Sequence, residues 1–425
     1  MSKRILVFPC GSEIGLEIHR ALRYSVHFEL VGASSVDDHG RFVYERYIGG
    51  LPFHDNPAFA TSLKKLIREK HIDAVYPTMD AVAETLQNLA HELGVRIIGS
   101  PIETTRICAS KRLTYSALAG LVPTPTVYPS IDAVPSYPIF IKPDRGYGSR
   151  HAARIDDPAN ASASLAQYAP NQMLILEHLP GKEWTIDCFS DRHGTLLFSA
   201  ARERARISNG ISVRTLPSTE FSAEFSNWAK VINEKLKPRG AWFFQAKVAR
   251  DGNPKLLEVA ARFAGSSAVQ RARGVNLPLL SVFDAFDYPV SILQNDYPVT
   301  LDRALENKYK IDLEFQHVYV DLDDCILLNE KVNHTLIAFL YRAISEGCTI
   351  TLLTRHKGDL KKTLQRARIH HLFDEIIHID RKENKADFIN AESAIFIDDS
   401  HRERHSVASR LKIPVFAPDM IETLL

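Results

Sequence analysis

Residues 318–324 read Val-Tyr-Val-Asp-Leu-Asp-Asp, an apolar run that ends in three aspartates. A later run, Ile395-Phe-Ile-Asp-Asp399, ends in the same way, and between the two lie Leu352-Leu-Thr354 and Lys385. Open parallel α/β sheets carry their functional loops at the carboxyl ends of the strands, so we expect these polar groups to meet at one edge of a sheet. A single Asp-rich strand end would be an ordinary turn or cap. Four such segments in this order favour metal-assisted phosphate chemistry.

The order of these segments resembles the haloacid dehalogenase (HAD) superfamily of aspartyl phosphotransferases, over residues 314–425. The resemblance implies a Rossmann-like domain with a parallel sheet, which hydrolyses a phosphomonoester through an aspartyl-phosphate and needs Mg²⁺. It assigns the nucleophile to Asp321, the acid to Asp323, the phosphoryl hydrogen bond to Thr354, the neutralising cation to Lys385 (or Lys382), and the metal site to Asp321, Asp323, Asp398 and Asp399. Cys325 departs mildly from the Thr or Val that this family usually carries. No insertion is long enough for a lid domain, so the site should be capless and open.

Length and composition limit the class of protein. The 425 residues suit two or three domains rather than one. The 52 basic and 51 acidic residues nearly cancel, so no overall field favours nucleic acid or a membrane surface as a partner. No apolar run reaches the length of a membrane span, and the first residues enter a strand without a long apolar signal region. Five scattered cysteines indicate reduced thiols, and we predict a cytoplasmic protein.

Residues 1–100 alternate between apolar runs and amphipathic segments, which predicts a parallel sheet covered by helices. Strands are expected at 3–9, 27–33, 72–77 and 95–99. The segment Gly11-Ser-Glu-Ile-Gly15 lacks the full Gly-x-Gly-x-x-Gly spacing of a dinucleotide-binding turn. No acidic residue ends the second strand, because Asp37 and Asp38 come later. A structural turn, or a loop that faces substrate, is favoured over NAD binding.

From Pro101 onward the pattern changes to strand-turn-strand units, after one helix that is expected over Glu103–Ala119. The strand Tyr137–Lys142 ends in a lysine and runs into Pro143-Asp-Arg-Gly-Tyr-Gly-Ser-Arg150. The backbone N–H groups of such a glycine-containing turn can cover a polyphosphate. It is not a Walker loop, because Gly-Lys-Ser/Thr is absent. Taken alone, a strand-end lysine is more often solvated than functional.

Six elements, taken in order, give residues 1–308 a resemblance to the ATP-grasp superfamily, nearest its carbamoyl-phosphate-synthase-like and amino-acid-ligase branch. They are Ser110-Lys111, Ile139-Phe-Ile-Lys142, Gly146-Tyr-Gly-Ser149, Ile175-Leu-Glu-His-Leu179, Gly181-Lys-Glu183 and Glu258-Val-Ala-Ala-Arg262. The resemblance implies a Rossmann-like pre-ATP-grasp domain over 1–100 and a two-lobed α+β ATP-grasp domain over 101–308. It also implies ATP and Mg²⁺, or Mn²⁺ in its place, as cofactors.

The same resemblance gives each group a role at an ATP site. It assigns phosphate binding to Lys111, Lys142, Gly146, Gly148 and Ser149, adenosine binding to Glu177, His178, Leu179 and Glu183, metal binding to Gln245 and Glu258, and phosphoryl stabilisation to Arg262. Arg202 and Arg204 are further candidates for an anionic substrate group. The family usually reads Glu-x-Asn-x-Arg where this chain has Ala260, so one ligand of the usual pair of metal sites is missing.

Together the two motif sets predict an α/β multidomain, bifunctional enzyme. The ATP-grasp part would activate a small carboxylate as an acyl phosphate and join it to an amine with release of ADP. The HAD-like part would hydrolyse a phosphomonoester. Two alternatives stay open: an ATP-grasp kinase whose product the phosphatase reverses, or a degenerate ATP-grasp module that senses nucleotide and regulates the phosphatase. The oligomeric state also stays open, with a homo-oligomer among the options.

Overall fold

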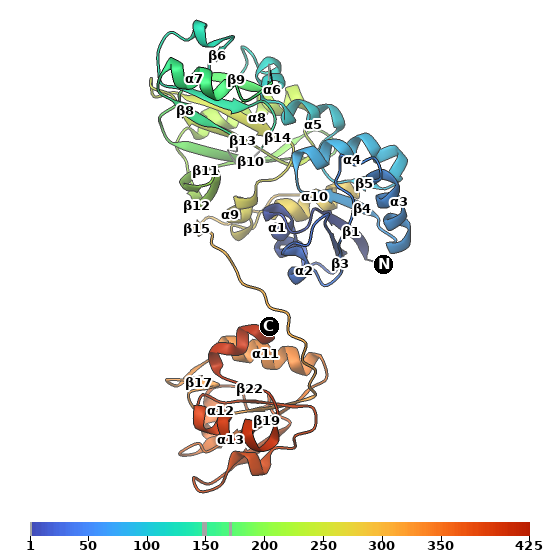
Figure 1. The fold of residues 1–425 in the computed structure, drawn as a ribbon, viewed down its shortest axis with the longest axis vertical. Helices are drawn as coiled ribbons and strands as arrows, with labels where there is room; N and C mark the ends of the chain where they lie inside the picture. The colour runs from blue at the N-terminus through green and yellow to red at the C-terminus, as the bar shows by residue number, and fades with distance from the viewer. Residues whose placement is uncertain (1, 147–150, 170–171) are drawn as a thin grey trace. The chain divides into compact units, whose positions relative to one another are not determined.

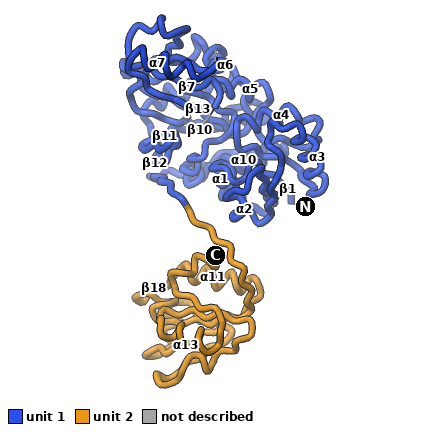
Figure 2. The backbone as a smooth tube through the Cα atoms, in the orientation of Figure 1, with its two compact units in different colours: residues 1–305 blue, residues 306–425 orange. Residues whose placement is uncertain are grey.

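The computed structural model in Figure 1 describes residues 2–146, 151–169 and 172–425. Gly148 and Ser149, two of the predicted phosphate ligands, lie outside the described residues. The chain divides into two compact units, unit 1 (residues 1–305) and unit 2 (residues 306–425), which Figure 2 colours separately. Within the described ranges, no helix is long and apolar enough to cross a membrane.

Unit 1 begins with a parallel sheet of strand order β3-β2-β1-β4-β5. Its strands are β1 (Lys3–Phe8), β2 (Phe28–Ala33), β3 (Tyr47–Ile48), β4 (Ala74–Pro77) and β5 (Arg96–Ile97). Its helices are α1 (Glu13–Leu22), α2 (Gly40–Val43), α3 (Phe59–Lys70) and α4 (Asp80–Leu93). The parallel register of β1 with both β2 and β4 confirms the parallel sheet that the sequence predicts.

Strand β1 is buried on both faces, which explains its unbroken apolar sequence. Ile5 and Val7 pack in one cluster with Ile18 of α1, whereas Leu6 packs in another with Leu63 of α3. Each such side chain contributes about 1.5–3 kcal/mol by its burial. The strand order reverses between β1 and β4, and the loops that leave the carboxyl ends of these two strands are where open α/β sheets bind ligands.

The rest of unit 1 is built on two antiparallel sheets. The smaller sheet has the order β6-β9-β7-β8, with β6 (Val127–Tyr128), β7 (Ile139–Pro143), β8 (Ala153–Ile155) and β9 (Met173–Glu177). The larger has the order β14-β13-β10-β11-β12-β15, with β10 (Glu183–Ser190), β11 (Leu196–Ser208), β12 (Ile211–Pro217), β13 (Gly240–Val248), β14 (Pro254–Ala260) and β15 (Leu301–Asp302). The helices are α5 (Ile102–Ala109), α6 (Lys111–Ala117), α7 (Pro158–Leu165), α8 (Ser222–Leu236), α9 (Ala268–Ala272) and α10 (Leu277–Ala285), with 3₁₀ turns η1 (Ile131–Ala133) and η2 (Gly265–Ser267).

The single helix expected over Glu103–Ala119 is wrong, because Ser110 divides it into α5 and α6. Ser110 has extended backbone angles, and its hydroxyl accepts a hydrogen bond from the backbone N–H of Leu113. A serine in this position caps the first turn of a helix. The break matters for the site, since it makes Lys111 the first residue of α6.

Three large aromatic residues of the larger sheet form the core between this sheet and α8. Trp184, Trp242 and Phe244 are fully buried and pack against Phe225 and Trp228 of α8. Trp184 and Trp242 each direct the indole N–H to a serine hydroxyl, which satisfies the polar edge of the ring. These rings therefore support the sheet and do not stack on a ligand.

Unit 2 is a parallel sheet of order β20-β19-β16-β21-β22 with helices and one small hairpin. The sheet contains β16 (His317–Val320), β19 (Thr349–Thr354), β20 (Glu375–His378), β21 (Ala394–Ile397) and β22 (Val415–Phe416). The hairpin pairs β17 (Leu327–Leu328) with β18 (Lys331–Val332), and the helices are α11 (His334–Ser345), α12 (Leu360–Arg366) and α13 (His401–Leu411), with 3₁₀ segments η3 (Lys385–Phe388) and η4 (Pro418–Leu424). Thr354 ends β19, whereas Asp321 and Asp398 directly follow β16 and β21.

Candidate active sites

Unit 1 contains a cavity of about 980 Å³ that brings together residues from both of its antiparallel sheets. Ten of the twelve site residues predicted for this part of the chain fall within the described ranges, and all ten line the cavity. Those that line the cavity are Lys111, Lys142, Gly146, Glu177, His178, Leu179, Glu183, Gln245, Glu258 and Arg262. The residues that the sequence predicts for an ATP site therefore lie around one cavity.

Those ten residues are the whole of the predicted set that the structure describes in unit 1, since Gly148 and Ser149 fall outside it. They come from α6, β7, β9, β10, β13 and β14 and from the loops that follow these elements. The cavity also receives Ser12 and Asp80, from the loops after β1 and β4. It therefore includes the point where the order of the parallel sheet reverses, which is where open α/β sheets bind ligands.

Two buried lysines give the cavity its positive charge. Lys142, at the end of β7, donates hydrogen bonds to Tyr115 Oη at 3.0 Å and to the carbonyl of Leu257 at 2.9 Å. Lys111 donates to the carbonyls of Asp144 and Gly146, both at 3.3 Å. Burial lowers the pKa of both lysines, that of Lys142 to about 8. In the described residues their hydrogen-bond partners are neutral oxygens, so an anion would add a charge partner that each ammonium group lacks.

Opposite the lysines, the larger sheet presents a row of polar side chains on one face. The strand registers place Glu258, Gln245, Thr185 and Arg202 side by side across β14, β13, β10 and β11. All four line the cavity. The hydroxyl of Thr185 is buried and has no hydrogen-bond partner among the described atoms. Arg202 is already neutralised, because it makes two hydrogen bonds to Asp187 and one to Ser266.

The other predicted groups of unit 1 are held by ion pairs. Arg262 lies 2.9 Å from the carboxylate of Asp80, and its guanidinium group stacks over the ring of Phe243. Glu183 lies 3.1 Å from Arg204 and 3.6 Å from Lys247.

Glu177 accepts a hydrogen bond from the backbone N–H of Thr126 and pairs with Lys255. Burial, with nearby cations, lowers the pKa of His178. Arg204 and Arg202 were proposed from the sequence as anion ligands. Their charges are largely neutralised by ion pairs with Glu183 and Asp187, respectively.

The loop from Gly11 to Gly15 borders the cavity but does not resemble a dinucleotide site in its packing. A Cβ atom at Gly11 would collide with the carboxylate of Asp38, and one at Gly15 would collide with the carbonyl of Cys10. The Asp38 side chain therefore occupies the space over Gly11 that a pyrophosphate would need. Because Ser12 lines the cavity, the interpretation as a turn that faces substrate fits the structure better than NAD binding.

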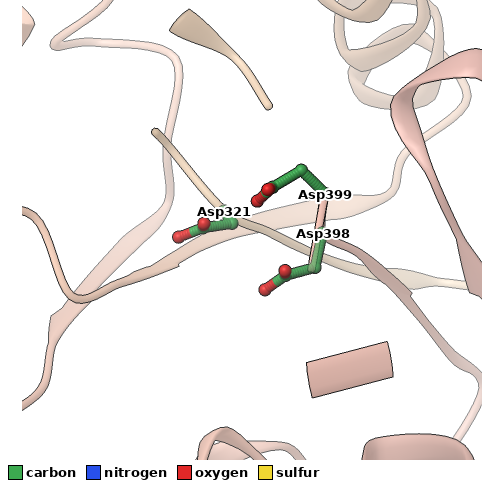
Figure 3. A group of neighbouring side chains, drawn as sticks. All are labelled: Asp321, Asp398 and Asp399. Carbon is green, nitrogen blue, oxygen red and sulfur yellow. The ribbon is translucent and has the colours of Figure 1, made fainter. Parts of the chain in front are cut away.

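In unit 2, three carboxylates converge where β16 and β21 lie side by side, as Figure 3 shows. Asp321, Asp398 and Asp399 each place one oxygen within 4.8 Å of the others. Lys385 lies between two of them, with its ammonium nitrogen 2.8 Å from Asp321 Oδ1 and 2.7 Å from Asp398 Oδ2. Burial raises the pKa of Asp398 to about 6 despite the opposing effect of Lys385. Burial also raises the pKa of Asp399.

The remaining residues predicted for unit 2 lie around these three carboxylates or in the loops nearby. Thr354 is buried at the end of β19, and its hydroxyl accepts a hydrogen bond from the backbone N–H of His356 at 3.2 Å. Asp323 lies outside the group of three carboxylates and contacts His356. Lys382 is exposed, whereas Lys385 is buried against Asp321, so of the two lysines it is Lys385 that contacts a predicted catalytic carboxylate.

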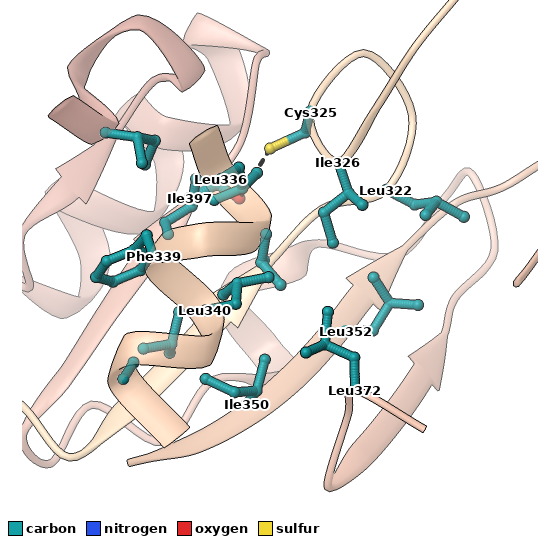
Figure 4. Close-up of a cluster of buried hydrophobic side chains, with 14 of the residues drawn as sticks. Leu322, Cys325, Ile326, Leu336, Phe339, Leu340, Ile350, Leu352, Leu372 and Ile397 are labelled. Atoms are coloured by element: carbon teal, nitrogen blue, oxygen red, sulfur yellow. Dashed lines mark hydrogen bonds between the residues drawn. The ribbon is translucent and has the colours of Figure 1, made fainter. Parts of the chain in front are cut away.

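The loop after β16 is anchored in the core of unit 2. Figure 4 shows Leu322, Cys325 and Ile326 among the buried side chains, in the same hydrophobic cluster as Leu336 of α11. The Cys325 thiol is directed to the carbonyl of Ile397, 3.9 Å away. Burial raises the pKa of Cys325, so this residue is a packing group and not a nucleophile. The core thereby fixes the backbone that carries the predicted nucleophile.

Comparison with known proteins finds relatives for unit 1. A family model described as "ATP-grasp in the biosynthetic pathway with Ter operon" matches residues 169–304. The carbamoyl phosphate synthase large chain of Methanothermobacter thermautotrophicus is 29% identical over 262 residues, which are 55% of this chain and 25% of that protein. A D-alanine–D-alanine ligase of Thermotoga maritima is 25% identical over 170 residues, 37% of this chain and 56% of that protein. Unit 1 is therefore called the ATP-grasp unit.

Solved structures share the ATP-grasp fold at low sequence identity. The biotin carboxylase domain of the Hydrogenobacter thermophilus 2-oxoglutarate carboxylase, bound to MgADP, ADP and bicarbonate, has a TM-score of 0.59 and 16% identity, covering 69% of this chain and 72% of that chain. N5-carboxyaminoimidazole synthetase from Staphylococcus aureus has a TM-score of 0.58 and 14% identity, covering 70% of this chain and 81% of that one. The family model ends at residue 304, so unit 2 lies beyond its match and its HAD-like character remains a prediction.

The ATP-grasp unit has donors for a metal ion but fewer than its family resemblance implies. Glu258 and Gln245 face the cavity as strand neighbours, and their oxygens suit Mg²⁺, which commonly uses one or two carboxylates together with phosphates and water. Ala260 is buried in an apolar cluster with Phe243 and Ala264. All three side chains also line the cavity, so the position of the missing ligand carries an apolar side chain, and the donors that are present support a cation at Glu258 and Gln245.

Several groups around the ATP-grasp cavity escaped the sequence prediction. Tyr115 accepts a hydrogen bond from Lys142. The carboxylate of Asp144 accepts one from the Ser110 hydroxyl, and that of Asp80 accepts one from Arg262. Asp80 follows the carboxyl end of β4, which is a signal that could have identified it. Tyr115 lies on α6, and no motif in the sequence marks it.

Proposed function

We propose that the ATP-grasp unit is an ATP-dependent ligase that joins a carboxylate to an amine and releases ADP. The observation that carries this proposal is the pairing, across one cavity, of two buried lysines with a carboxylate and an amide. Lys111 and Lys142 present positive charge, and Glu258 and Gln245 face them as oxygen donors. This is the arrangement that a triphosphate with a bound cation requires. The D-alanine–D-alanine ligase among the relatives belongs to the same reaction class.

Each residue of the cavity takes a role in this proposal. Glu258 and Gln245 would hold Mg²⁺, which supplies charge neutralisation at the phosphates. Lys111 and Lys142 would bind phosphate oxygens as point charges. Arg262, oriented by Asp80, would stabilise the phosphoryl group as it passes to the substrate carboxylate and forms an acyl phosphate. The amine would then displace phosphate from the acyl carbon, which leaves an amide bond.

ADP release tests the ligase proposal. We expect ADP to form only when a suitable carboxylate and amine are both present, and Lys142→Ala to abolish its formation. Lys65→Ala is the matched control, because Lys65 is exposed on α3. Release of no ADP from a broad library of acids and amines would contradict the proposal. Carboxylate labelled with ¹⁸O separates ligation from an alcohol kinase, since ligation alone transfers label into phosphate.

We propose, as a second function, that unit 2 hydrolyses a phosphomonoester. The observation in favour is Lys385, which lies between Asp321 and Asp398 at the carboxyl edge of the parallel sheet. Asp321, Asp398 and Asp399 would hold Mg²⁺, which lets a carboxylate approach an anionic phosphoryl group. Thr354 would donate a hydrogen bond to that group, and Lys385 would offset its charge.

The proposed hydrolysis has two steps. A carboxylate oxygen of Asp321 bonds to phosphorus while the ester P–O bond breaks and Asp323 gives its proton to the leaving alcohol. Asp323 then takes a proton from water, whose oxygen bonds to phosphorus and releases Asp321 and phosphate. The segment between Asp321 and Thr354 contains one short hairpin and one helix, so nothing in it forms a lid.

Hydrolysis of an aryl phosphate by the full chain tests the second function. We expect p-nitrophenyl phosphate to be hydrolysed in the presence of Mg²⁺, and Asp321→Asn to abolish this activity. Asp419→Asn, at an exposed position of η4, serves as the control and should leave the rate unchanged. Retention of hydrolysis in Asp321→Asn would exclude the aspartyl-phosphate route.

The alternative in which the ATP-grasp unit only senses nucleotide is favoured by Ala260, which removes one metal donor. It predicts ATP binding without turnover, together with a phosphatase rate that responds to ATP. If both units are active, their fusion keeps the product of one near the site of the other at a raised effective concentration. Phosphatase rates measured with and without ATP distinguish sensing from two independent activities.

A further inference from the structure

The side chain of Asp323 contacts His356 and lies outside the group formed by Asp321, Asp398 and Asp399. Its two oxygens lie 2.9 and 3.0 Å from His356 Nδ1. The Asp323 side chain is 51% exposed, whereas that of His356 is 12% exposed. A mostly buried imidazole therefore fixes a carboxylate that solvent would otherwise surround.

His356 is itself fixed from three elements of unit 2. Its Nε2 lies 3.0 Å from Thr363 Oγ1 on α12, and its backbone N–H donates to Thr354 Oγ1 at the end of β19. Its carbonyl accepts a hydrogen bond of 2.9 Å from Nε2 of His378, at the end of β20. If the Thr363 hydroxyl donates to Nε2, then Nδ1 carries the hydrogen and donates it to Asp323. These contacts fix the position of the ring, with Asp323 as the partner of Nδ1 and Thr363 as the partner of Nε2.

We propose that His356 is a positioning residue for Asp323, an inference that rests on the phosphatase function proposed for unit 2. An exposed aspartate has several rotamers, and only some direct its carboxyl group to the leaving oxygen. The hydrogen bond from His356 selects one of them. Proton transfer in the first step depends on this geometry, because the proton must pass from Asp323 to the ester oxygen as its bond to phosphorus breaks.

This role makes the effect of His356 depend on the leaving group. A p-nitrophenolate ion leaves without a proton, whereas an alkyl alcohol leaves slowly unless an acid protonates its oxygen. Loss of the positioning contact should therefore slow the hydrolysis of an alkyl phosphate far more than that of p-nitrophenyl phosphate. A residue that only supported the fold would slow both substrates alike.

The test compares glycerol phosphate with p-nitrophenyl phosphate in the full chain. We expect His356→Ala to lower kcat/KM about 10- to 100-fold for glycerol phosphate and less than about 3-fold for p-nitrophenyl phosphate. His356→Asn should recover most of the loss, because its amide nitrogen takes approximately the place of Nδ1. His371→Ala, at an exposed position, is the control and should match the wild type. In an Asp323→Asn background, His356→Ala should have no further effect.

The outcomes distinguish a positioning role for His356 from a purely structural role and from failure of the phosphatase proposal. Equal slowing of both substrates by His356→Ala, or additive losses in the double variant, would overturn the positioning role while leaving the phosphatase proposal intact. If the wild type hydrolyses neither substrate, or Asp321→Asn retains activity, the phosphatase proposal itself fails and this inference fails with it. Selective loss on glycerol phosphate, together with recovery in His356→Asn, supports the role.

Discussion

The ammonium nitrogen of Lys142 lies 3.0 Å from the phenolic oxygen of Tyr115 and 5.5 Å from the centroid of its ring. Its other hydrogen bond goes to the carbonyl of Leu257. Both partners are neutral, so they orient the cation without cancelling its charge. Burial lowers the pKa of Lys142 from 10.5 to about 8, which means that the charge is retained at neutral pH but is easily lost above it.

ATP binding should therefore weaken in mildly alkaline solution. With the pKa of Lys142 at about 8, the ammonium form falls from about nine-tenths at pH 7 to about one-tenth at pH 9, so the affinity for a triphosphate should fall roughly tenfold. Lys142→Arg keeps its charge over this range and should show a flatter dependence. Calorimetric titration with a non-hydrolysable ATP analogue measures both. Parallel curves for the two proteins would show that Lys142 does not carry the effect.

Ala260→Asn should reveal whether this position can still receive a metal ligand. The amide would enter the apolar cluster of Ala260, Phe243 and Ala264, so we expect a loss of about 1–3 kcal/mol in the free energy of unfolding without ligand. MgATP should stabilise the variant more than the wild type if the amide oxygen reaches the cation. All three tryptophans lie in unit 1, so their fluorescence follows its unfolding. Ala260→Leu, of similar size, should gain nothing extra from MgATP.

Lys385→Met should destabilise unit 2 strongly. It leaves the buried carboxylates of Asp321 and Asp398 without their shared cation, and breaking a buried ion pair in this way costs about 3–5 kcal/mol. Urea unfolding followed by circular dichroism measures the loss, while tryptophan fluorescence from unit 1 should not change. Lys382→Met, at an exposed position, should behave like the wild type. The reverse result would reassign the neutralising lysine.

Cation binding to unit 2 should strengthen as the pH rises through about 6. Burial raises the pKa of Asp398 from 3.8 to about 6, and a proton on this group competes with a metal ion. Mn²⁺ affinity, followed by its paramagnetic resonance signal, should rise between about pH 5 and pH 7. Without metal, the folded unit keeps a proton that the unfolded chain has released between about pH 4 and pH 6, so the free energy of unfolding should fall as the pH rises through this window. Asp398→Asn should remove both dependences.

Much of the site arrangement in unit 2 was predictable from the sequence. Parallel strands bring their carboxyl ends to one edge, so apolar runs followed by Asp321 and Asp398 were enough to predict that these carboxylates meet. The direction of Asp323 was not predictable, because its partner His356 lies in another loop, whose path depends on tertiary packing. The Arg262–Asp80 pair was equally hidden, since 182 residues separate its members.

The helix break at Ser110 lies between these cases. A serine before Lys111 is a cap signal that can be read in the sequence, but an uninterrupted helical pattern on both sides outweighed it. The structure shows why the break persists: Asp144, 34 residues away, accepts the Ser110 hydroxyl and the backbone N–H of Arg112. Long-range hydrogen bonds of this kind decide boundaries that local propensity leaves open.

Each unit has buried hydrophobic clusters made entirely of its own side chains, such as those around Leu63 in unit 1 and Phe339 in unit 2. Two such cores should melt as two cooperative events, each with its own enthalpy. A single midpoint for the whole chain would then be an average that describes neither core, and a differential scanning trace would have to be separated into components before any variant could be ranked.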